Sequence, residues 1–328
     1  MSVPLSAGSK VLIIRLSSIG DIVLCTPIIR CLSKQLDCKI HFLQKEKFKE
    51  VLSASPYIDR HLYLESDNLK SELQAEDYDL VIDLHKNLRT FRIKKWLSVR
   101  SITFNKVNVE KFLLVNYKID LLPKEHLVDR YFNAVKKIGV INDGGGLDFF
   151  IEEKVPKDDI KIPYIALVLG AAHYTKQLPQ HLLQEVIALS TTKIVLLGGE
   201  AELEKSKQLE NSDNVLKNYA GKLSLQDSAR IVRGASVVIT GDTGLMHISA
   251  AFQKPIVCVW GSTVPAFGMY PYYGKSERKE SRVEIKELAC RPCTKIGRAS
   301  CPKEHFSCMN DLSANDIILK TNELLLRN

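Results

Sequence analysis

Short apolar segments alternate with longer amphipathic segments along most of the chain. The short segments have the length and composition of buried strands. We expect strands over residues 11–16, 39–43, 80–84, 101–104, 164–169, 193–197, 237–240 and 255–260. Helical periodicity predicts helices over residues 21–34, 179–190, 201–210, 224–233, 243–252 and 313–326, the last with Ser313 as its N-cap. This alternation is typical of parallel sheets built from βαβ units, so we predict an α/β protein.

The length of the chain predicts two domains, because 328 residues exceed what one hydrophobic core usually covers. Residues 152–163 are charged, contain two prolines and lack apolar periodicity, which is typical of a linker. We therefore predict domains over residues 1–155 and 156–312, followed by a C-terminal helix over 313–328. Ligands of open α/β sheets bind beyond the carboxyl ends of the strands, so candidate chemistry is expected there.

The net charge of +8 is concentrated in the segment Lys86–Lys118, which has nine basic residues and one acid, Glu110. Such a segment attracts phosphates, anionic lipid or nucleic acid, unless it is simply a solvated face. The segment has no RNA-binding aromatic signature, zinc finger or helix-turn-helix pattern, so we expect no nucleic-acid partner. The chain has no long apolar span and no signal-peptide core, and its scattered cysteines indicate a reducing compartment, so we expect a cytoplasmic protein.

The first predicted strand ends in Ser17-Ser18-Ile19-Gly20-Asp21. Two hydroxyls, a glycine and a carboxylate at a strand tip indicate a ligand site. A free aspartate has a pKa of about 3.9, so Asp21 is expected to be charged at neutral pH. The alternative is that Asp21 caps a helix beginning at Ile22, with a kink at Pro27.

Two strand ends in the second half have small residues and charges that suit a diphosphate nucleotide. Lys176 follows Gly170 with no acid near it in the sequence, and is either a phosphate-binding point charge or a surface lysine. Gly198-Gly199-Glu200 permits a tight turn and an acid for ribose hydroxyls, or is an ordinary turn.

A third strand end, GDTGLMH, is the most informative. Thr243 and Gly244 open a predicted helix, whose free N–H groups and dipole favour phosphate. His247 lies one turn further on the same face, and Asp242 precedes the helix. The alternatives are that Asp242 is an N-cap and that His247 is a core residue. The chain has neither a Walker loop nor GxGxxG after its first strand, which argues against an ATPase and a standard nicotinamide enzyme.

Near the C-terminus, cysteines and a histidine are spaced CxxC-x7-C-x3-H-x2-C. This spacing suits a structural zinc site. The candidate ligands are Cys290, Cys293, Cys301 and Cys308, with His305 as an alternative. Reduced thiols or a disulfide are the other interpretations.

These segments occur in an order that resembles the bacterial lipopolysaccharide heptosyltransferases, glycosyltransferase family 9. The similarity runs through KVLIIRLSSIGDIVLCTPIIRCL, VIDLHKNLRT, LGAAHYTKQLP, LLGGEAE and ITGDTGLMHISAAFQKPIVCVWG. It implies a GT-B fold, in which two Rossmann-like domains face a central cleft and the final helix packs back on the first domain. It also implies inverting transfer of heptose from ADP-heptose to a lipid A-linked inner-core acceptor, with no cofactor required for catalysis.

The resemblance assigns roles to individual residues. Asp21 becomes the base that takes the acceptor proton, and Lys176 binds the donor phosphates. The other donor residues implied are Gly170, Gly199, Glu200 or Glu202, Asp242, Thr243, Gly244 and His247. The acceptor residues implied are Ser18, Gly20, Lys86 and Arg89.

The implied partners are a nucleotide sugar, a lipid-linked saccharide and an anionic membrane surface on the cytoplasmic side, with the segment Lys86–Lys118 helping the protein to dock there. Some heptosyltransferases carry hydroxyl residues where this chain has Ala171 and Ala172, which leaves the donor open. Three alternatives remain: a transferase for another nucleotide sugar, an enzyme like the sugar-nucleotide 2-epimerases, and a non-catalytic nucleotide-sugar-binding protein.

Overall fold

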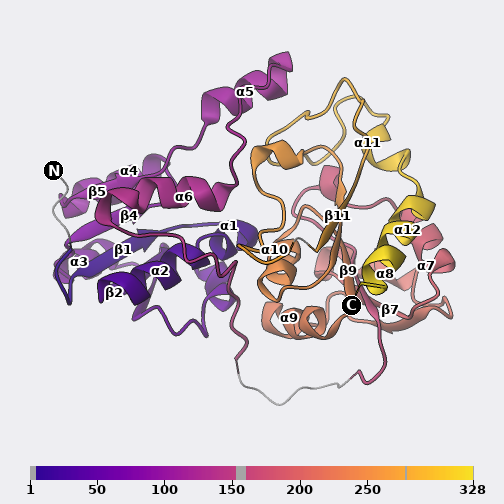
Figure 1. The fold of residues 1–328 in the computed structure, drawn as a ribbon, viewed down its shortest axis with the longest axis horizontal. Coiled ribbons are helices and arrows are strands. Elements are labelled where there is room, and N and C mark those ends of the chain that lie inside the picture. The colour runs from indigo at the N-terminus through magenta and orange to yellow at the C-terminus, as the bar shows by residue number, and fades with distance from the viewer. Residues whose placement is uncertain (1–4, 153–159, 278, 328) are drawn as a thin grey trace. The chain divides into compact units, whose positions relative to one another are not determined.

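The computed structural model describes residues 5–152, 160–277 and 279–327, which form two compact α/β units (Figure 1). The first unit contains the chain up to Val107 together with Glu125–Glu152 and Gly274–Ser276. The second contains the remaining described residues, including Asn108–Lys124. Two α/β units were predicted, but residues 108–124 belong with the second unit, not with the first. The predicted boundary between residues 155 and 156 lies outside the described residues.

The first unit is built on a parallel sheet in the order β3-β2-β1-β4-β5. Its strands are β1 (Lys10–Ile14), β2 (Lys39–Gln44), β3 (Arg60–Tyr63), β4 (Leu80–Asp83) and β5 (Ser101–Thr103). Its helices are α1 (Ile19–Val23), α2 (Thr26–Leu36), η1 (Glu46–Val51), α3 (Leu69–Ala75), α4 (Leu88–Leu97), α6 (Leu127–Val135) and η2 (Lys136–Ile138). On one face of the sheet, Leu12 and Val81 pack with Leu73 of α3 and Ile93 of α4.

The second unit is built on a parallel sheet in the order β11-β10-β9-β6-β7-β8. Its strands are β6 (Ile165–Val168), β7 (Ile194–Leu197), β8 (Val215–Asn218), β9 (Val237–Gly241), β10 (Ile256–Trp260) and β11 (Glu280–Glu284). Its helices are α5 (Asn108–Tyr117), η3 (Tyr174–Lys176), α7 (Gln180–Leu189), η4 (Glu200–Glu202), α8 (Leu203–Lys207), α9 (Leu225–Gly234), α10 (Gly244–Ala251), η5 (Pro265–Phe267), α11 (Ser307–Asn310) and α12 (Ala314–Leu325).

Helices cover both faces of the second sheet, and the strands alternate accordingly. Leu167 and Ile239 point into the core that α7 and α12 cover, whereas Ala166 and Val238 point into the core under α9. Because successive strand residues face opposite sides, a strand covered on both faces must be apolar throughout. This explains why the central strands were evident in the sequence.

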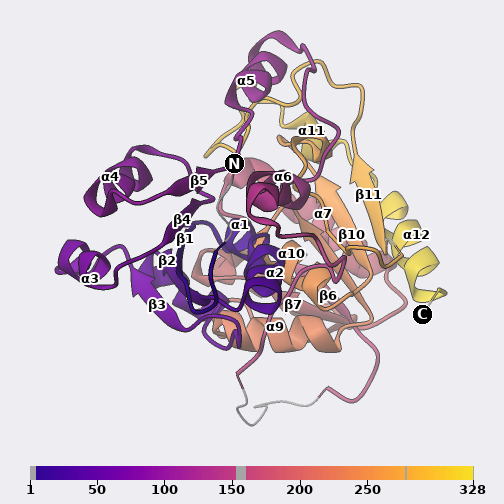
Figure 2. The ribbon, with the colours of Figure 1, turned by 60° about the vertical axis from the view of Figure 1, so that its left-hand side comes forward.

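The final helix packs within the second unit. α12 lies against α7, β9, β10 and β11, and Figure 2 shows it beside β11. Its apolar side chains Ile317, Ile318 and Leu324 complete the core on that face of the sheet. Ser313 caps the helix by accepting a hydrogen bond from the Asp316 N–H, at 3.2 Å, as predicted.

Each sheet has one position at which the order of its strands reverses, and this position lies between β1 and β4 in the first unit and between β6 and β9 in the second. Loops that leave adjacent strands in opposite directions open a crevice there, where α/β proteins bind their ligands. In the described part of the chain, no helix is long and apolar enough to cross a bilayer.

Candidate functional site

In the first unit, the turn after β1 orients the Asp21 carboxylate through Ser18, the N-cap of α1. Asp21 is the third residue of α1, and its carboxylate accepts hydrogen bonds from the Ser18 N–H (3.1 Å) and the Ser18 Oγ–H (2.9 Å). The alternative that Asp21 caps a helix from Ile22 was therefore wrong. The predicted single helix is also two helices, and Pro27 lies in the first turn of α2, where no N–H is needed.

Arg15, which the sequence analysis did not single out, organises this carboxylate. Its buried guanidinium forms an ion pair with Asp21 and donates hydrogen bonds to the Ser17 carbonyl (2.9 Å) and the Tyr131 hydroxyl (3.1 Å). Burial by itself raises the pKa of Asp21, but the charge of Arg15 and the hydrogen bonds from Ser18 outweigh it and lower this pKa to about 2. Asp21 is therefore an ionised, oriented carboxylate at neutral pH.

On the other side of the same strand reversal, the turn after β4 is built around the buried carboxylate of Asp83. It accepts hydrogen bonds from the N–H groups of His85 (3.0 Å) and Lys86 (2.7 Å) and from the Thr90 hydroxyl (2.8 Å). These bonds hold Lys86 in the left-handed region, with φ of 53°. The predicted acceptor residues Lys86 and Arg89 are both exposed on this turn and on the first turn of α4.

His85, in the turn after β4, is another residue that was not predicted from the sequence. Burial, with the charges of Arg15 and Lys106, lowers the pKa of His85 to about 4, so its imidazole is neutral at pH 7. The Lys106 ammonium donates a hydrogen bond to the His85 carbonyl oxygen at 2.9 Å. The turn therefore places a neutral imidazole in the electrostatic environment of Arg15 and Asp21.

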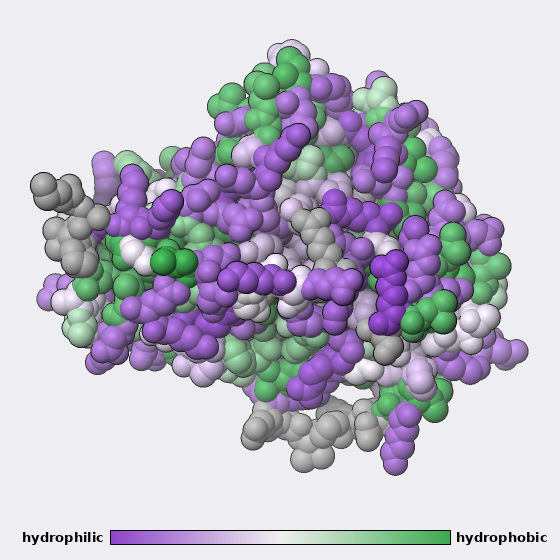
Figure 3. All heavy atoms as spheres, viewed as in Figure 1, coloured by the Kyte–Doolittle hydropathy of each residue, from purple (hydrophilic) through white to green (hydrophobic). Residues whose placement is uncertain are grey.

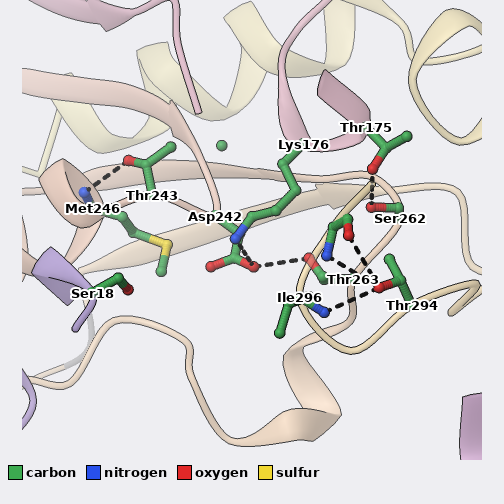
Figure 4. A network of polar contacts seen from close by, with 12 residues as sticks. Ser18, Thr175, Lys176, Asp242, Thr243, Met246, Ser262, Thr263, Thr294 and Ile296 are labelled. Carbon is green, nitrogen blue, oxygen red and sulfur yellow. Dashed lines mark hydrogen bonds and ion pairs between the residues drawn. The ribbon is translucent and has the colours of Figure 1, made fainter. Parts of the chain in front are cut away.

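In the second unit, the two loops that flank the strand reversal meet in an ion pair. Lys176 follows β6 and Asp242 follows β9, and Lys176 Nζ lies 2.8 Å from Asp242 Oδ2 (Figure 4). The Thr263 hydroxyl, from the loop after β10, donates a hydrogen bond to the same oxygen at 2.9 Å. The two backbone segments approach so closely here that a Cβ on Gly241 would lie 2.6 Å from the Lys176 carbonyl oxygen. Lys176, which has no nearby acid in the sequence, acquires one by folding.

Thr175, beside Lys176, joins two further segments. Its hydroxyl oxygen accepts a hydrogen bond from the Ser262 hydroxyl at 2.9 Å (Figure 4). It also accepts one from the Arg298 N–H at 2.9 Å. The buried guanidinium of Arg291 donates to the carbonyl oxygens of Gly261 (2.6 Å) and Thr263 (3.0 Å). Ser262 and Thr263 were not predicted as site residues, because nothing in the sequence places their loop beside Lys176.

The loop after β9 begins α10 as predicted. Thr243, and not Asp242, is the N-cap, and its hydroxyl oxygen accepts a hydrogen bond from the Met246 N–H at 3.3 Å (Figure 4). Gly244 is the first residue of α10, and His247 is buried one turn later. The N-terminus of α10 and the Lys176 ammonium thus supply positive potential in the same unit, as a diphosphate site requires.

Of the two candidate acids for a ribose, Glu202 is used inside the protein. Its buried carboxylate accepts hydrogen bonds from the Gly199 N–H (2.8 Å) and from the Gln177 amide (3.3 Å), joining the loops after β6 and β7. It also packs against Gly170, where a Cβ would lie 2.3 Å from the carboxyl carbon. Glu200 is exposed and is the acid that remains open to a ligand.

Comparison with known proteins identifies the family. The family model for glycosyltransferase family 9 (heptosyltransferase) matches residues 67–299, which is more than half of the chain. The chain belongs to glycosyltransferase family 9. This glycosyltransferase is 24% identical to lipopolysaccharide heptosyltransferase 1 of Escherichia coli K12 over 305 residues, covering 82% of this chain and 92% of the relative.

Solved structures agree with the fold of this glycosyltransferase. A family 9 glycosyltransferase from Veillonella parvula gives a TM-score of 0.76 at 21% identity, covering 99% of this chain and 100% of that one. An E. coli heptosyltransferase solved with ADP gives a TM-score of 0.68 at 23% identity, covering 96% and 99%. The predicted GT-B fold class, with two parallel-sheet α/β domains, is thereby confirmed.

The cysteines near the C-terminus of the glycosyltransferase do not form the predicted zinc site. Among the described residues, no group of three or more histidine, cysteine or acidic side chains is placed to hold a metal. Cys290 Sγ lies 3.8 Å from His305 Nε2, while Cys308 is buried in the core with Met309. All eight cysteines are free, so no disulfide joins them either.

Proposed function

We propose that this glycosyltransferase moves heptose from ADP-heptose to a lipid-linked inner-core saccharide of lipopolysaccharide, with inversion at the anomeric carbon. The observation that carries the proposal is that each unit has its charged groups at its strand reversal. The first has the ionised Asp21 beside Arg15, and the second has Lys176, Asp242 and the start of α10.

The first unit supports binding of the acceptor. In an inverting transfer, the acceptor hydroxyl attacks the anomeric carbon while the bond from that carbon to the diphosphate breaks, and the hydroxyl proton must leave. Asp21 takes this proton in our proposal. Its low pKa makes it a weak base, so it acts through its position and accepts the proton late in the attack. The exposed Lys86 and Arg89 suit the phosphates and carboxylates of an anionic saccharide.

The second unit supports binding of the donor. The E. coli heptosyltransferase of similar fold has been solved with ADP and with ADP-2-deoxy-2-fluoro heptose. In this chain, the Lys176 ammonium and the N–H groups that begin α10 would stabilise the charge of the leaving diphosphate. Asp242 would accept hydrogen bonds from sugar hydroxyls, and Glu200 from the ribose. In our proposal these groups take the place of a catalytic metal.

The acceptor's lipid anchor implies that the enzyme works at the cytoplasmic face of a membrane. Nine basic residues against one acid between Lys86 and Lys118 support attraction to anionic lipid. Arg89, Arg92 and Lys95 are exposed on α4, together with the apolar side chains of Leu88 and Phe91.

The deciding experiment combines titration calorimetry with a transfer assay. We expect the metal-free protein to bind ADP and ADP-heptose in preference to UDP, GDP and their sugars. With ADP-heptose and a de-acylated inner-core acceptor, mass spectrometry should detect the heptosylated product and NMR an inverted anomeric configuration. Preference for UDP or GDP would overturn the donor assignment.

The variant Asp21→Asn tests the proposed base. It keeps the size of the side chain but cannot accept the acceptor's proton, so transfer should fall by about 10²-fold or more. The affinity for ADP should stay within twofold or so of the wild type, because Asp21 belongs to the other unit. Normal turnover by this variant would exclude Asp21 as the base.

A further inference from the structure

One segment of the second unit exposes an unusual number of apolar side chains. Residues Asn108–Lys124, which we call the α5 excursion, lie in the sequence between two segments of the first unit. They belong to the second unit and contribute α5 to it. The exposed fractions of their large apolar side chains are 69% for Val109, 55% for Phe112, 64% for Tyr117, 48% for Ile119 and 62% for Leu121. In Figure 3 a group of apolar residues lies over the element that Figure 1 labels α5.

The α5 excursion is fixed to a loop near the C-terminus. The Lys118 ammonium donates hydrogen bonds to the carbonyl oxygens of Pro292, at 2.8 Å, and Cys290, at 3.2 Å. The Lys111 ammonium lies 5.9 Å from the centre of the Phe267 ring. The exposed apolar side chains are therefore presented on an anchored segment.

The loop that Lys118 holds is basic and also exposes an apolar tip. Residues 292–303, which we call the basic loop, contain Lys295, Arg298 and Lys303 and no acid, and all three cations are exposed. Ile296, between two of these cations, is 60% exposed. The Arg298 N–H binds the Thr175 hydroxyl at 2.9 Å, so the basic loop is joined to the residue next to Lys176.

We propose that the α5 excursion and the basic loop insert together into the headgroup and acyl boundary of an anionic bilayer. The two segments together carry six cations, Lys111, Lys118, Lys124, Lys295, Arg298 and Lys303, against two acids, Glu110 and Asp120. Apolar side chains among an excess of cations match a surface that is negative outside and apolar beneath, which is the pattern of interfacial membrane segments. A purely apolar protein partner would leave Lys295 and Arg298 without counter-charges, and a nucleic acid would leave the apolar side chains in water. The inference rests on the proposed function, whose acceptor is anchored in such a bilayer, and it identifies the surface that enters it.

The test measures partition of the full-length protein onto vesicles. We expect binding to phosphatidylcholine vesicles that contain phosphatidylglycerol, and much weaker binding to phosphatidylcholine alone. The double variant Phe112→Ser/Ile119→Ser should reduce partition onto the mixed vesicles by about tenfold or more. Lys295→Glu/Arg298→Glu should reduce it similarly and flatten its dependence on salt. Leu319→Ser, which changes a leucine that is 56% exposed on α12, is the matched control and should bind as the wild type does.

A second measurement places the segment in the bilayer directly. A tryptophan at position 112, introduced as Phe112→Trp, should be quenched by phospholipids brominated near the headgroup, whereas Leu319→Trp should not. Equal partition by wild type and both double variants, or no quenching at position 112, would overturn the inference. Transfer to the de-acylated acceptor, which needs no membrane, separates this proposal from the proposed function. If the wild type transfers heptose in solution but the variants do not change partition, the proposed membrane surface is wrong and the enzymatic function stands.

Discussion

Arg15 sets the ionisation of the proposed base, and a change at this residue should be visible in the pH dependence of the reaction. With Arg15 present, the pKa of Asp21 is about 2, so Asp21 is deprotonated at every pH at which the enzyme is assayed. The acidic limb of the kcat profile should therefore not come from Asp21 in the wild type. In Arg15→Met, burial is no longer outweighed by a positive charge, and the pKa of Asp21 should rise.

The expected result for Arg15→Met is a new acidic limb, with kcat falling as the pH decreases because Asp21 becomes protonated. Arg15→Lys keeps the charge and should keep most of the wild-type profile, although it loses the planar donor geometry. Stopped or continuous transfer assays from pH 4.5 to 9 with saturating substrates provide the measurement. A Met variant with reduced kcat but an unchanged profile would mean that Arg15 acts only in folding.

Lys176 and Asp242 should have opposite effects on the affinity for ADP. Lys176→Met removes a cation from the diphosphate site, so the Kd for ADP should rise by about tenfold to a hundredfold. Asp242→Asn removes the competing carboxylate 2.8 Å from Lys176 Nζ, so ADP should bind at least as tightly as in the wild type. Transfer should fall in both variants. Calorimetry with ADP is the measurement, and weaker binding in Asp242→Asn would show that the carboxylate itself supports the nucleotide site.

At the scale of elements, the ends of β6 and β7 are held together by one buried carboxylate. Gly170→Ala would place a Cβ 2.3 Å from the Glu202 carboxyl carbon and force that side chain away from the Gly199 N–H. Overpacking of this kind costs about 1–3 kcal/mol of stability. The ADP affinity should fall as well, because both loops are displaced.

Gly199→Ala is the matched control for Gly170→Ala. Its φ of −82° suits any residue, and its Cβ would lie 3.5 Å from Glu202, an ordinary contact. The thermal unfolding of the two variants should therefore differ, with Gly199→Ala close to the wild type. Equal destabilisation by both would contradict the assigned role of Glu202.

The central strands and the principal turns could be predicted from the sequence, because strands covered on both faces are continuous apolar runs. The strands β3, β8 and β11 were not predicted, since they are edge strands whose side chains are largely half-buried or exposed and give no such run. Local sequence patterns also predicted where α12 and α10 begin, at Ser313 and Thr243. They misplaced the cap of α1, where Ser18 and not Asp21 precedes the helix.

The partners of the site residues could not be predicted, because they depend on the order of the strands in each sheet, which local sequence patterns do not give. Lys176 and Asp242 are separated by more than sixty positions but flank one strand reversal, so folding makes them an ion pair. Arg15 was hidden for a related reason. It follows the apolar run of β1, and two of its four hydrogen-bonding or ionic partners are distant in the sequence, one after β4 and one in α6.

At the scale of the whole molecule, each unit has its own core, and the membership of two segments could not be predicted from their position in the chain. Asn108–Lys124 follows the first unit's strands but packs in the second, where Lys118 binds backbone carbonyl groups of residues 290 and 292. α12 ends the chain and also packs in the second unit, through Ile317 and its neighbours. In both cases the decisive interactions are long-range ones, which periodicity does not report.

Separate cores lead to a prediction about how ADP stabilises the protein. Ile317→Ala removes fully buried atoms from the second unit, and Leu73→Ala does the same in the first; each should cost about 2–5 kcal/mol. ADP binds the second unit in our proposal, so ADP at one hundred times its Kd should raise the free energy of unfolding of that unit alone by about 2.7 kcal/mol. Hydrogen exchange followed by peptide mass spectrometry distinguishes the units. ADP should restore protection to β6, β7 and β9 in Ile317→Ala but leave β1 and β4 unprotected in Leu73→Ala. Equal restoration in both variants would mean that the two units unfold as one, or that ADP contacts both.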